Sequence, residues 1–465
     1  MRFPFAVGLP ALLAAGLSPA KAEDLCVLEP GILRFEDDYG CFDGPNRPTG
    51  FPGALKSFEF GTERNVHLSI GGEVRQRYEY TRNPGFGAAP QDDAGVWLQR
   101  YTLHGDLTIG PHVRLFGQLS SALEAGRADG PSPVDENTLA IPNAFADIKF
   151  PLGSGAGLTL RAGRQEMRFG SGRLIDAREG PNVRRSFNAW RAIFQSPDWQ
   201  VNAIAGRPVS PRRGTFDDET DPEQSLWGIY ATKHSERNLL GSFDIYYLGF
   251  EDKAGAFAQG TASERRHSIG TRFFGERNGW DWNWEAVYQF GSFGGGDISA
   301  WTLASETGFT FRNARWTPRI AISANIASGD KNASDGDLGT FNPLFPRGNY
   351  FSEAALLGPR NFINFHPYVS VHPSDAWSLT ADLNLFWRLE AEDGVYAPSG
   401  QLIRGPSGSG ERFVGSALSV SSNYLLADNL SFAAVYTHFF PGGFLRETGP
   451  AEDVDFFELT LQYKF

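Results

Sequence analysis

The sequence predicts an all-β protein, a transmembrane antiparallel β-barrel of about 18 strands, with 16 as the alternative count. Apolar and polar residues alternate with a period of two in many stretches of about ten residues, the length of a tilted membrane-spanning strand. Short and long connections alternate between these stretches. Aromatic residues lie near the ends of the apolar faces, where the two membrane interfaces favour them.

Composition and charge exclude several other classes. The 465 residues carry a formal net charge of −12 and include 38 Phe, 14 Tyr and 11 Trp. So many aromatic rings argue against an intrinsically disordered chain. The acidic balance argues against nucleic acid as a partner, because a phosphate backbone requires a basic protein face. Beyond the first two dozen residues, no apolar run approaches the ~20 residues of a spanning helix, which excludes a bundle of transmembrane helices.

The chain begins with a predicted secretory signal peptide, residues 1–22. Arg2 supplies the positive charge at its start, residues 5–17 form a short apolar core, and Ala20-Lys21-Ala22 is an A-x-A-like cleavage site. A buried N-terminal helix is the alternative interpretation. An exported chain is therefore expected.

Residues 23–64 precede the first predicted strand, and we expect them to form a periplasmic segment or to tuck into the barrel lumen. Cys26 and Cys41 are candidates for a disulfide in this segment, because an exported chain meets an oxidising compartment. Two free thiols are the alternative. The segment is too short for the plug domain of an energy-coupled receptor.

The clearest alternation lies in residues 457–465, where apolar residues occupy every second position and polar residues lie between them. A strand separates these two sets onto opposite faces, whereas a helix would mix them. The same pattern occurs in residues 66–80, 280–290 and 377–388. A soluble β-sandwich would also alternate, but rings such as Trp280 and Trp377 at the ends of the faces favour contact with lipid. The barrel is therefore predicted to span residues 65–465.

Eighteen strands are predicted, and they begin near residues 65, 95, 113, 143, 158, 190, 199, 225, 239, 265, 280, 299, 316, 365, 377, 412, 430 and 454. Short connections are expected at 110–112, 196–198, 234–238, 312–315 and 373–376. Long ones are expected at 83–94, 168–189, 208–224, 328–364 and 390–411. Short periplasmic turns and long extracellular loops are typical of barrels in the bacterial outer membrane, which is the predicted location.

The polar faces of the predicted strands are rich in arginine. A barrel of 16 to 18 strands is too wide to be filled by its own side chains, so its inward residues line an aqueous path. The arginines expected to point inward are Arg75, Arg77, Arg100, Arg114, Arg161, Arg319 and Arg388. Because the guanidinium fork binds carboxylates and stays charged, they predict an anion-selective pore. The alternative is that these arginines pair with wall carboxylates such as Glu73 and Glu79.

Two predicted loops are unusual in composition. Residues 163–187 interleave many charges with Gly and Phe, and residues 339–351 read GTFNPLFPRGNYF. The first is expected to fold against the barrel rather than extend into solvent. Its candidate residues for a charged constriction of the lumen are Arg173, Asp176, Glu179, Arg184 and Arg185. An ion-paired structural loop is the alternative.

Three runs in these loops, GRQEMRFGSGRL (163–174), REGPNVRRSF (178–187) and GTFNPLFPRGNYF (339–351), resemble the alginate export family of outer-membrane proteins. The resemblance covers about residues 66–465. It implies an 18-stranded monomeric barrel, surrounded by outer-membrane lipid and lipopolysaccharide, that passes an anionic polysaccharide by diffusion and works with periplasmic export partners. At the matching positions it implies pore roles for Arg164, Arg173, Arg178, Glu179, Arg184, Arg185 and Arg347.

Other chemistry is sparse. The chain contains no motif of a hydrolase, a metalloprotease or a nucleotide-binding loop, so neither an enzyme nor a cofactor is predicted. Asp330, Asp335 and Asp337 resemble a loose set of oxygen ligands for Ca²⁺, but their spacing misses the EF-hand pattern. A hydrophilic loop tip is the favoured interpretation there.

Three hypotheses of function remain. The first is a channel for passive diffusion of an anionic polysaccharide or uronate through an arginine-rich pore. The second is a substrate-selective porin for small organic or aromatic acids. The third is an outer-membrane enzyme, for which the sequence offers no convincing set of catalytic residues.

Overall fold

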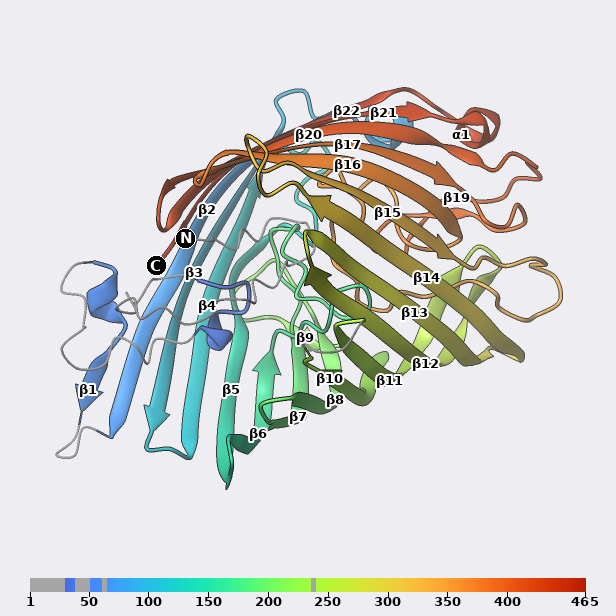
Figure 1. Ribbon diagram of the computed structural model, residues 1–465. Coiled ribbons are helices and arrows are strands. Elements are labelled where there is room, and N and C mark those ends of the chain that lie inside the picture. The colour runs from blue at the N-terminus through green and yellow to red at the C-terminus, as the bar shows by residue number, and fades with distance from the viewer. Residues whose placement is uncertain (1–29, 38–50, 61–64, 236–239) are drawn as a thin grey trace.

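The computed structural model describes residues 30–37, 51–60, 65–235 and 240–465 (Figure 1). The predicted signal peptide, Cys26 and Cys41 lie outside the described residues. Within them, no helix has both the length and the apolar character needed to cross a bilayer.

Eighteen antiparallel strands of the described chain form one closed barrel (Figure 1). The first nine are β2 (Val66–Arg82), β3 (Val96–Ile109), β4 (Val113–Ala125), β5 (Asn137–Gly153), β6 (Ala156–Gln165), β7 (Phe187–Gln195), β8 (Trp199–Ser210), β10 (Gln224–Lys233) and β11 (Ser242–Phe257). The others are β12 (Gly260–Arg277), β13 (Trp280–Phe293), β14 (Gly296–Thr310), β15 (Arg319–Ala327), β16 (Phe362–Ser374), β17 (Trp377–Trp387), β20 (Phe413–Ala427), β21 (Leu430–Pro441) and β22 (Val454–Lys464). Each strand pairs with its neighbours in sequence, and β22 closes the barrel on β2, with Lys464 opposite Glu73. The predicted fold class and the count of 18 are confirmed.

Small elements decorate this barrel. They are β1 (Phe58–Phe60), β9 (Glu219–Thr220), the hairpin of β18 (Val395–Tyr396) with β19 (Leu402–Arg404), the helix α1 (Gly443–Thr448), and the 3-10 turns η1 (Arg34–Glu36), η4 (Gly53–Leu55) and η5 (Pro84–Gly87). β1 extends the sheet beside the start of β2, and β9 extends it beside the end of β8.

Connection length differs between the two ends of the barrel. The end near β1 carries short turns, such as 110–112 and 196–198. The other end carries the long loops 83–95, 126–136, 166–186, 211–223, 328–361, 388–412 and 442–453. Two connections at the loop end are instead tight hairpins, at 258–259 and 294–295. The first joins β11 to β12 and the second joins β13 to β14. These four strands are among the longest, and they extend the wall where other strands end in a loop.

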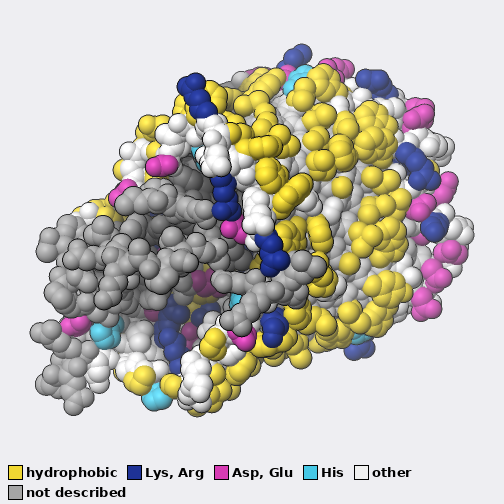
Figure 2. Space-filling model, in the orientation of Figure 1, with side chains coloured by type: hydrophobic (Ala, Val, Ile, Leu, Met, Phe, Trp, Pro, Cys, Tyr) yellow, Lys and Arg dark blue, Asp and Glu magenta, His cyan; other side chains and the backbone are white. Residues whose placement is uncertain are grey.

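The two faces of the wall differ as the alternation predicts. On β14, Trp301 and Leu303 point outward and are 36% and 52% exposed, whereas Thr302 and Glu306 point inward and are buried. Figure 2 shows a band of hydrophobic side chains covering the outer face on this side, with charged side chains along both of its edges. This is the arrangement of a wall that faces hydrocarbon.

Substituting Leu303 by arginine tests this assignment. Leu303 lies midway along β14 and points outward between Ala286 and Ile326 of the neighbouring strands. We expect Leu303→Arg to destabilise the barrel by about 2–4 kcal/mol, the usual cost of a cation at the bilayer midplane. The measurement is the denaturant midpoint of unfolding in lipid vesicles. Leu402→Arg, in the loop-end hairpin, is the matched control, and equal midpoints for the two variants would contradict a lipid-facing Leu303.

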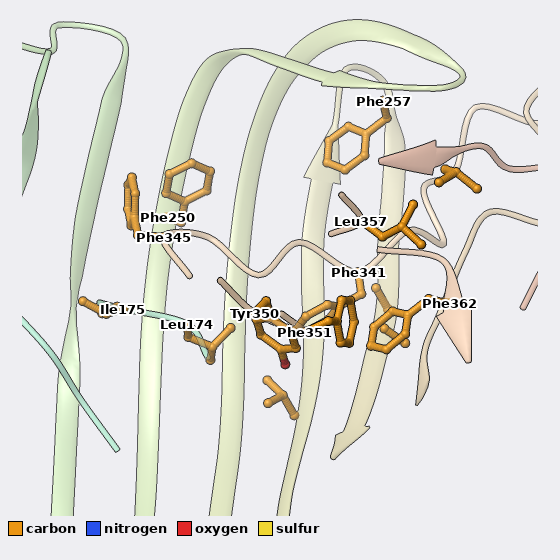
Figure 3. Close-up of a cluster of buried hydrophobic side chains, with 14 of the residues drawn as sticks. Leu174, Ile175, Phe250, Phe257, Phe341, Phe345, Tyr350, Phe351, Leu357 and Phe362 are labelled. Carbon is orange, nitrogen blue, oxygen red and sulfur yellow. The ribbon is translucent and has the colours of Figure 1, made fainter. Parts of the chain in front are cut away.

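Loop residues pack the interior of the barrel. Leu174 and Ile175 of the 166–186 loop pack with aromatic side chains of the 328–361 loop in a buried cluster inside the barrel (Figure 3). The wall arginines therefore face packed chain rather than bulk water, and Arg75 and Arg100 are only 1% and 0% exposed. The expectation of a wide aqueous path needs this correction, because the loops occupy the space that the wall leaves open.

Part of the segment before the barrel also lies inside it. Phe35, in η1, packs against Phe116 and Phe145 on the inner face of β4 and β5. The sequence left the periplasm and the lumen as alternatives for this segment, and residues 30–37 occupy the lumen.

Candidate functional site: the arginine-rich lumen

Two loops meet inside the barrel and form what we call the loop junction, residues 172–178 with 345–348. Ile175 and Phe345 make a parallel β-bridge. Three backbone hydrogen bonds join the segments: Asp176 N–H to Phe345 O (2.9 Å), Phe345 N–H to Leu174 O (2.9 Å) and Arg347 N–H to Gly172 O (3.0 Å). The junction holds the 166–186 loop and the 328–361 loop together across the lumen.

Glycine makes this close approach geometrically feasible. Gly172 has a φ of +73°, a conformation that residues with side chains rarely adopt, and its N–H closes a turn on Phe169 O. Gly348 lies so close to the other loop that a Cβ there would come within 2.7 Å of Pro181 Cδ. Backbone packing at and beside the junction therefore explains Gly172 and Gly348.

Glu179 anchors the 166–186 loop to the wall. It forms a hydrogen bond with Arg100 and ion pairs with Arg184 at 3.1 Å and Arg75 at 3.8 Å. Arg100 also binds Glu73 on β2 at 2.8 Å. Burial disfavours ionisation of Glu179, but Arg100, Arg184 and Arg75 outweigh it and hold the pKa of Glu179 well below its usual value. The carboxylate therefore stays charged, and it neutralises arginines that the sequence marked as pore-lining.

Other candidate arginines are paired as well. The pairs are Arg77 with Glu458 (3.3 Å), Arg114 with Asp106 (2.5 Å), Arg161 with Asp147 (2.7 Å), Arg173 with Glu285 (3.0 Å), Arg184 with Glu166 (3.0 Å) and Arg319 with Glu306 (3.0 Å). Arg173 therefore bonds to the wall rather than to Asp176 or Glu179. In each pair a carboxylate compensates the guanidinium charge.

Arg178, Arg185 and Arg347 are different, and all three lie at or beside the loop junction. In the described chain, none has a carboxylate within 4 Å. Their guanidinium groups donate only to backbone carbonyls, those of Val183 (3.3 Å), Pro346 (3.3 Å) and Tyr350 (3.2 Å) respectively. Asp176, the nearest acid of the junction, pairs with Arg168 at 3.2 Å and accepts the Arg178 backbone N–H. The junction therefore has an excess of positive charge.

Burial makes this excess charge costly. Burial, followed by the neighbouring charge of Arg178, lowers the pKa of Arg185 to about 9. Burial, followed by the charge of Arg173, lowers the pKa of Arg347. A buried cation without an anionic partner gains most from an anion that enters beside it. The junction is therefore well suited to bind a carboxylate.

Arg164 and Arg388 have other roles. Arg164 bonds to Asn188 Oδ1 at 3.1 Å on the adjacent strand. Arg388 is fully buried, lies 3.8 Å over the ring of Phe444, and donates to the carbonyls of Ala391, Asp393, Ser409 and Glu411. The Arg388 guanidinium thus holds the 388–412 loop, and its pore-lining role stays a prediction.

The aspartates suggested as Ca²⁺ ligands cap backbone groups. Asp335 accepts the N–H of Asp337, and Asp337 accepts the N–H of Asp297 on β14. Among the described residues, no three His, Cys, Asp or Glu are grouped so that they could hold a metal ion. Asp335 and Asp337 are exposed, whereas Asp330 is buried.

Comparison with known proteins agrees with this geometry. A family model described as alginate export matches residues 66–457, which is most of the chain. The chain belongs to the alginate export family. No curated protein matches the sequence. The family assignment and the closed barrel place the chain in the bacterial outer membrane, among transport barrels rather than enzymes.

Solved structures share the fold of this alginate export family member at low sequence identity. Acinetobacter baumannii OccAB1 aligns with a TM-score of 0.58 at 12% identity, covering 88% of this chain and 98% of OccAB1. Pseudomonas aeruginosa OccK2 in complex with glucuronate gives 0.53 at 11%, covering 86% and 96%. Pseudomonas aeruginosa OpdK with vanillate gives 0.56 at 10%, covering 86% and 98%. The barrel thus resembles the Occ outer-membrane channels.

Sequence analysis missed lumen residues of this family member. Arg191 points inward from β7, where it donates to Asn202 Oδ1 at 2.7 Å. Its alternation with the outward Trp190 was a usable signal. Arg360 of the 328–361 loop donates to Asn342 Oδ1 at 3.0 Å and lies 4.8 Å over the ring of Phe257. Nothing in the local sequence around Arg360 indicates that it points into the lumen.

Acidification should shift the ion selectivity of the barrel towards anions through Glu353. This loop carboxyl accepts a hydrogen bond from Asn349 at 2.7 Å. Burial and then Glu458 raise the pKa of Glu353 to about 6, against the opposing charge of Arg77. Glu353 is therefore mostly charged at about pH 7.5 and mostly neutral at about pH 5.

Reversal potentials at these two pH values measure the effect. In the wild type, the reversal potential is expected to shift towards anion selectivity at the lower pH, because Glu353 loses its negative charge. Glu353→Gln should reduce this pH dependence, whereas Glu447→Gln, at an exposed position in α1, should leave it intact. The same pH dependence in both variants would contradict a role for Glu353.

Proposed function

We propose that the chain is a passive channel for anionic saccharides, uronates or their polymers, with the loop junction as its selective constriction. The observation that carries this proposal is the set of three junction arginines, Arg178, Arg185 and Arg347, which are without a carboxylate within 4 Å in the described chain. Each offers guanidinium N–H groups that now bind only carbonyls, and a carboxylate from solution would be a stronger partner.

Transport follows from exchange between such sites. A sugar carboxylate would replace its water with guanidinium groups and move on to the next site, provided that each site binds it weakly enough. The cavity beside Arg173 and Arg347 has a volume of about 40 Å³, above the ~10–15 Å³ that holds one water molecule but too small for a sugar ring. A sugar ring therefore needs the two loops of the junction to move apart.

Two further observations support an anionic saccharide. The family to which the chain belongs is described as alginate export, and alginate is a polymer of uronates. OccK2, which has the same fold, has been solved in complex with glucuronate. Diffusion down a gradient needs no energy coupling.

Planar bilayer recordings test the proposal. Under a KCl gradient the reversal potential should show anion selectivity. Short uronate oligomers should block the current at concentrations where neutral oligosaccharides of equal length do not. Cation selectivity without block by uronates would refute the proposal.

Small aromatic acids remain the second candidate substrate. OpdK, another structure with this fold, was solved with vanillate. An aromatic acid shares the carboxylate of a uronate but lacks its ring hydroxyls. If benzoate blocks the channel and uronates do not, the lumen is selective for aromatic acids.

A further inference from the structure

Residues 30–37 are held inside the lumen by hydrogen bonds to the first and last strands of the barrel. Arg34 is 3% exposed and donates to the backbone carbonyls of Gly72 on β2 (2.9 Å) and of the C-terminal Phe465 (2.8 Å). It also pairs with Asp37 of its own segment at 2.8 Å. These bonds place η1 against the inner wall where β2 and β22 meet.

The side chain of Phe35 occupies an aromatic cage on the wall. Phe116 and Phe145 stack on each other with centroids 5.4 Å apart, and Phe35 meets their rings edge-on at 5.7 and 5.2 Å. The guanidinium of Arg161 lies 4.7 Å over the Phe35 ring and 3.9 Å over that of Phe145. Phe35 is 3% exposed, so the cage is full.

Lumen arginines bind the rest of the segment. Arg184 donates to Ile32 O at 2.8 Å, and Arg114 donates to Phe35 O at 2.6 Å. The Glu36 side chain is exposed to the lumen, and its carboxylate interacts electrostatically with Arg191, Arg161 and Arg168. The segment thus satisfies Arg184 and Arg114 through carbonyl oxygens, and it brings the Glu36 carboxylate into a positively charged part of the lumen.

The segment therefore presents a ring and, one residue later, a carboxylate to an aromatic and cationic wall. A uronate or an aromatic acid carries the same two features on one molecule. We infer that the wall around Phe116, Phe145 and Arg161 is a binding site for a ring-bearing carboxylate, which residues 32–37 occupy as an internal competitor. This inference rests on the proposed function, because its ligand is the cargo of the channel.

Competition of this kind weakens the apparent affinity for the cargo. A ligand binds only the fraction of molecules from which residues 32–37 have withdrawn, so weaker docking of the segment raises the observed affinity. Withdrawal also leaves Arg114 and Arg184 without the carbonyl partners that the segment supplies, and the incoming carboxylate can replace these partners.

The double variant Phe35→Ala/Glu36→Gln tests the inference. In planar bilayers, the concentration of glucuronate that halves the current should fall about tenfold relative to the wild type, which corresponds to about 1.4 kcal/mol. The matched control is Glu59→Gln/Phe60→Ala, which removes the same two side-chain types in β1, outside the cage. Adding Phe145→Ala to the double variant should abolish the gain, because it removes part of the site itself.

Each outcome has a distinct meaning. Benzoate run in parallel distinguishes an aromatic acid from a uronate as the better ligand, and neutral glucose should block no variant. Equal half-blocking concentrations in the wild type, the double variant and the control would overturn the inference while leaving an anion-selective, uronate-blocked channel intact. A wild-type channel that is cation-selective and is not blocked by uronates would instead refute the proposed function. If the double variant does not fold, Glu36→Gln alone should show a smaller change in the same direction.

Discussion

Replacing Arg178, Arg185 and Arg347 together by glutamine is expected to abolish the anion preference that we propose for the channel. These residues supply the excess positive charge of the loop junction, and their guanidinium groups bind only backbone carbonyls. A hydrogen bond to a charged group contributes about 1.5–3 kcal/mol, so block by uronates should weaken about tenfold or more for each arginine removed. Reversal potential and half-blocking concentration in planar bilayers are the two measurements.

The matched control removes three arginines from the outside of the barrel. Arg212, Arg265 and Arg312 have exposed side chains, and replacing them by glutamine changes the total charge by the same amount. That variant should keep the reversal potential of the wild type. If the junction variant keeps it as well, these three arginines do not determine selectivity.

Glu179→Gln is expected to produce the largest loss of stability. The substitution leaves Arg75 and Arg100, which are 1% and 0% exposed, without the carboxylate that the 166–186 loop provides. Breaking a buried ion pair by removing one partner costs about 3–5 kcal/mol. The free energy of unfolding in lipid vesicles should fall accordingly, and hydrogen exchange should rise within residues 166–186 as the loop leaves the wall.

The control for this substitution is Glu219→Gln. Glu219 pairs with Arg212 at 2.6 Å, but both side chains are more than half exposed. Exposed pairs contribute about 0–1 kcal/mol, so this variant should be close to the wild type. Similar losses in the two variants would show that Glu179 is not the anchor of the loop.

The barrel itself was predictable because the period of two directly reports which side chains meet lipid. Errors in strand limits arose where a strand continues beyond the membrane. β5 was predicted to begin near residue 143 but begins at Asn137, and β12 was predicted near 265 but begins at Gly260. These extra residues lie at the loop end of the barrel, where the sequence shows weaker hydrophobic alternation.

The candidate site was predictable only in part. Alternation placed Arg75 and Arg100 on the inner face, but not their partner Glu179, because that contact depends on the path of a loop. Arg184 and Arg185 are adjacent and were treated alike. Arg184 pairs with Glu166 and Glu179, whereas Arg185 meets the carbonyl of Pro346. Which arginine stays unpaired depends on distant segments, and no local pattern reports it.

The bridge between Ile175 and Phe345 has a consequence for the shape of the barrel. Its two loops arise from the β6–β7 and β15–β16 connections, which are separated by eight strands on one side of the ring and ten on the other. The bridge therefore connects nearly opposite sides of the barrel, and it should resist flattening of the cross-section into an ellipse. Because the bridge joins two distant parts of the sequence, it should form among the last contacts during assembly.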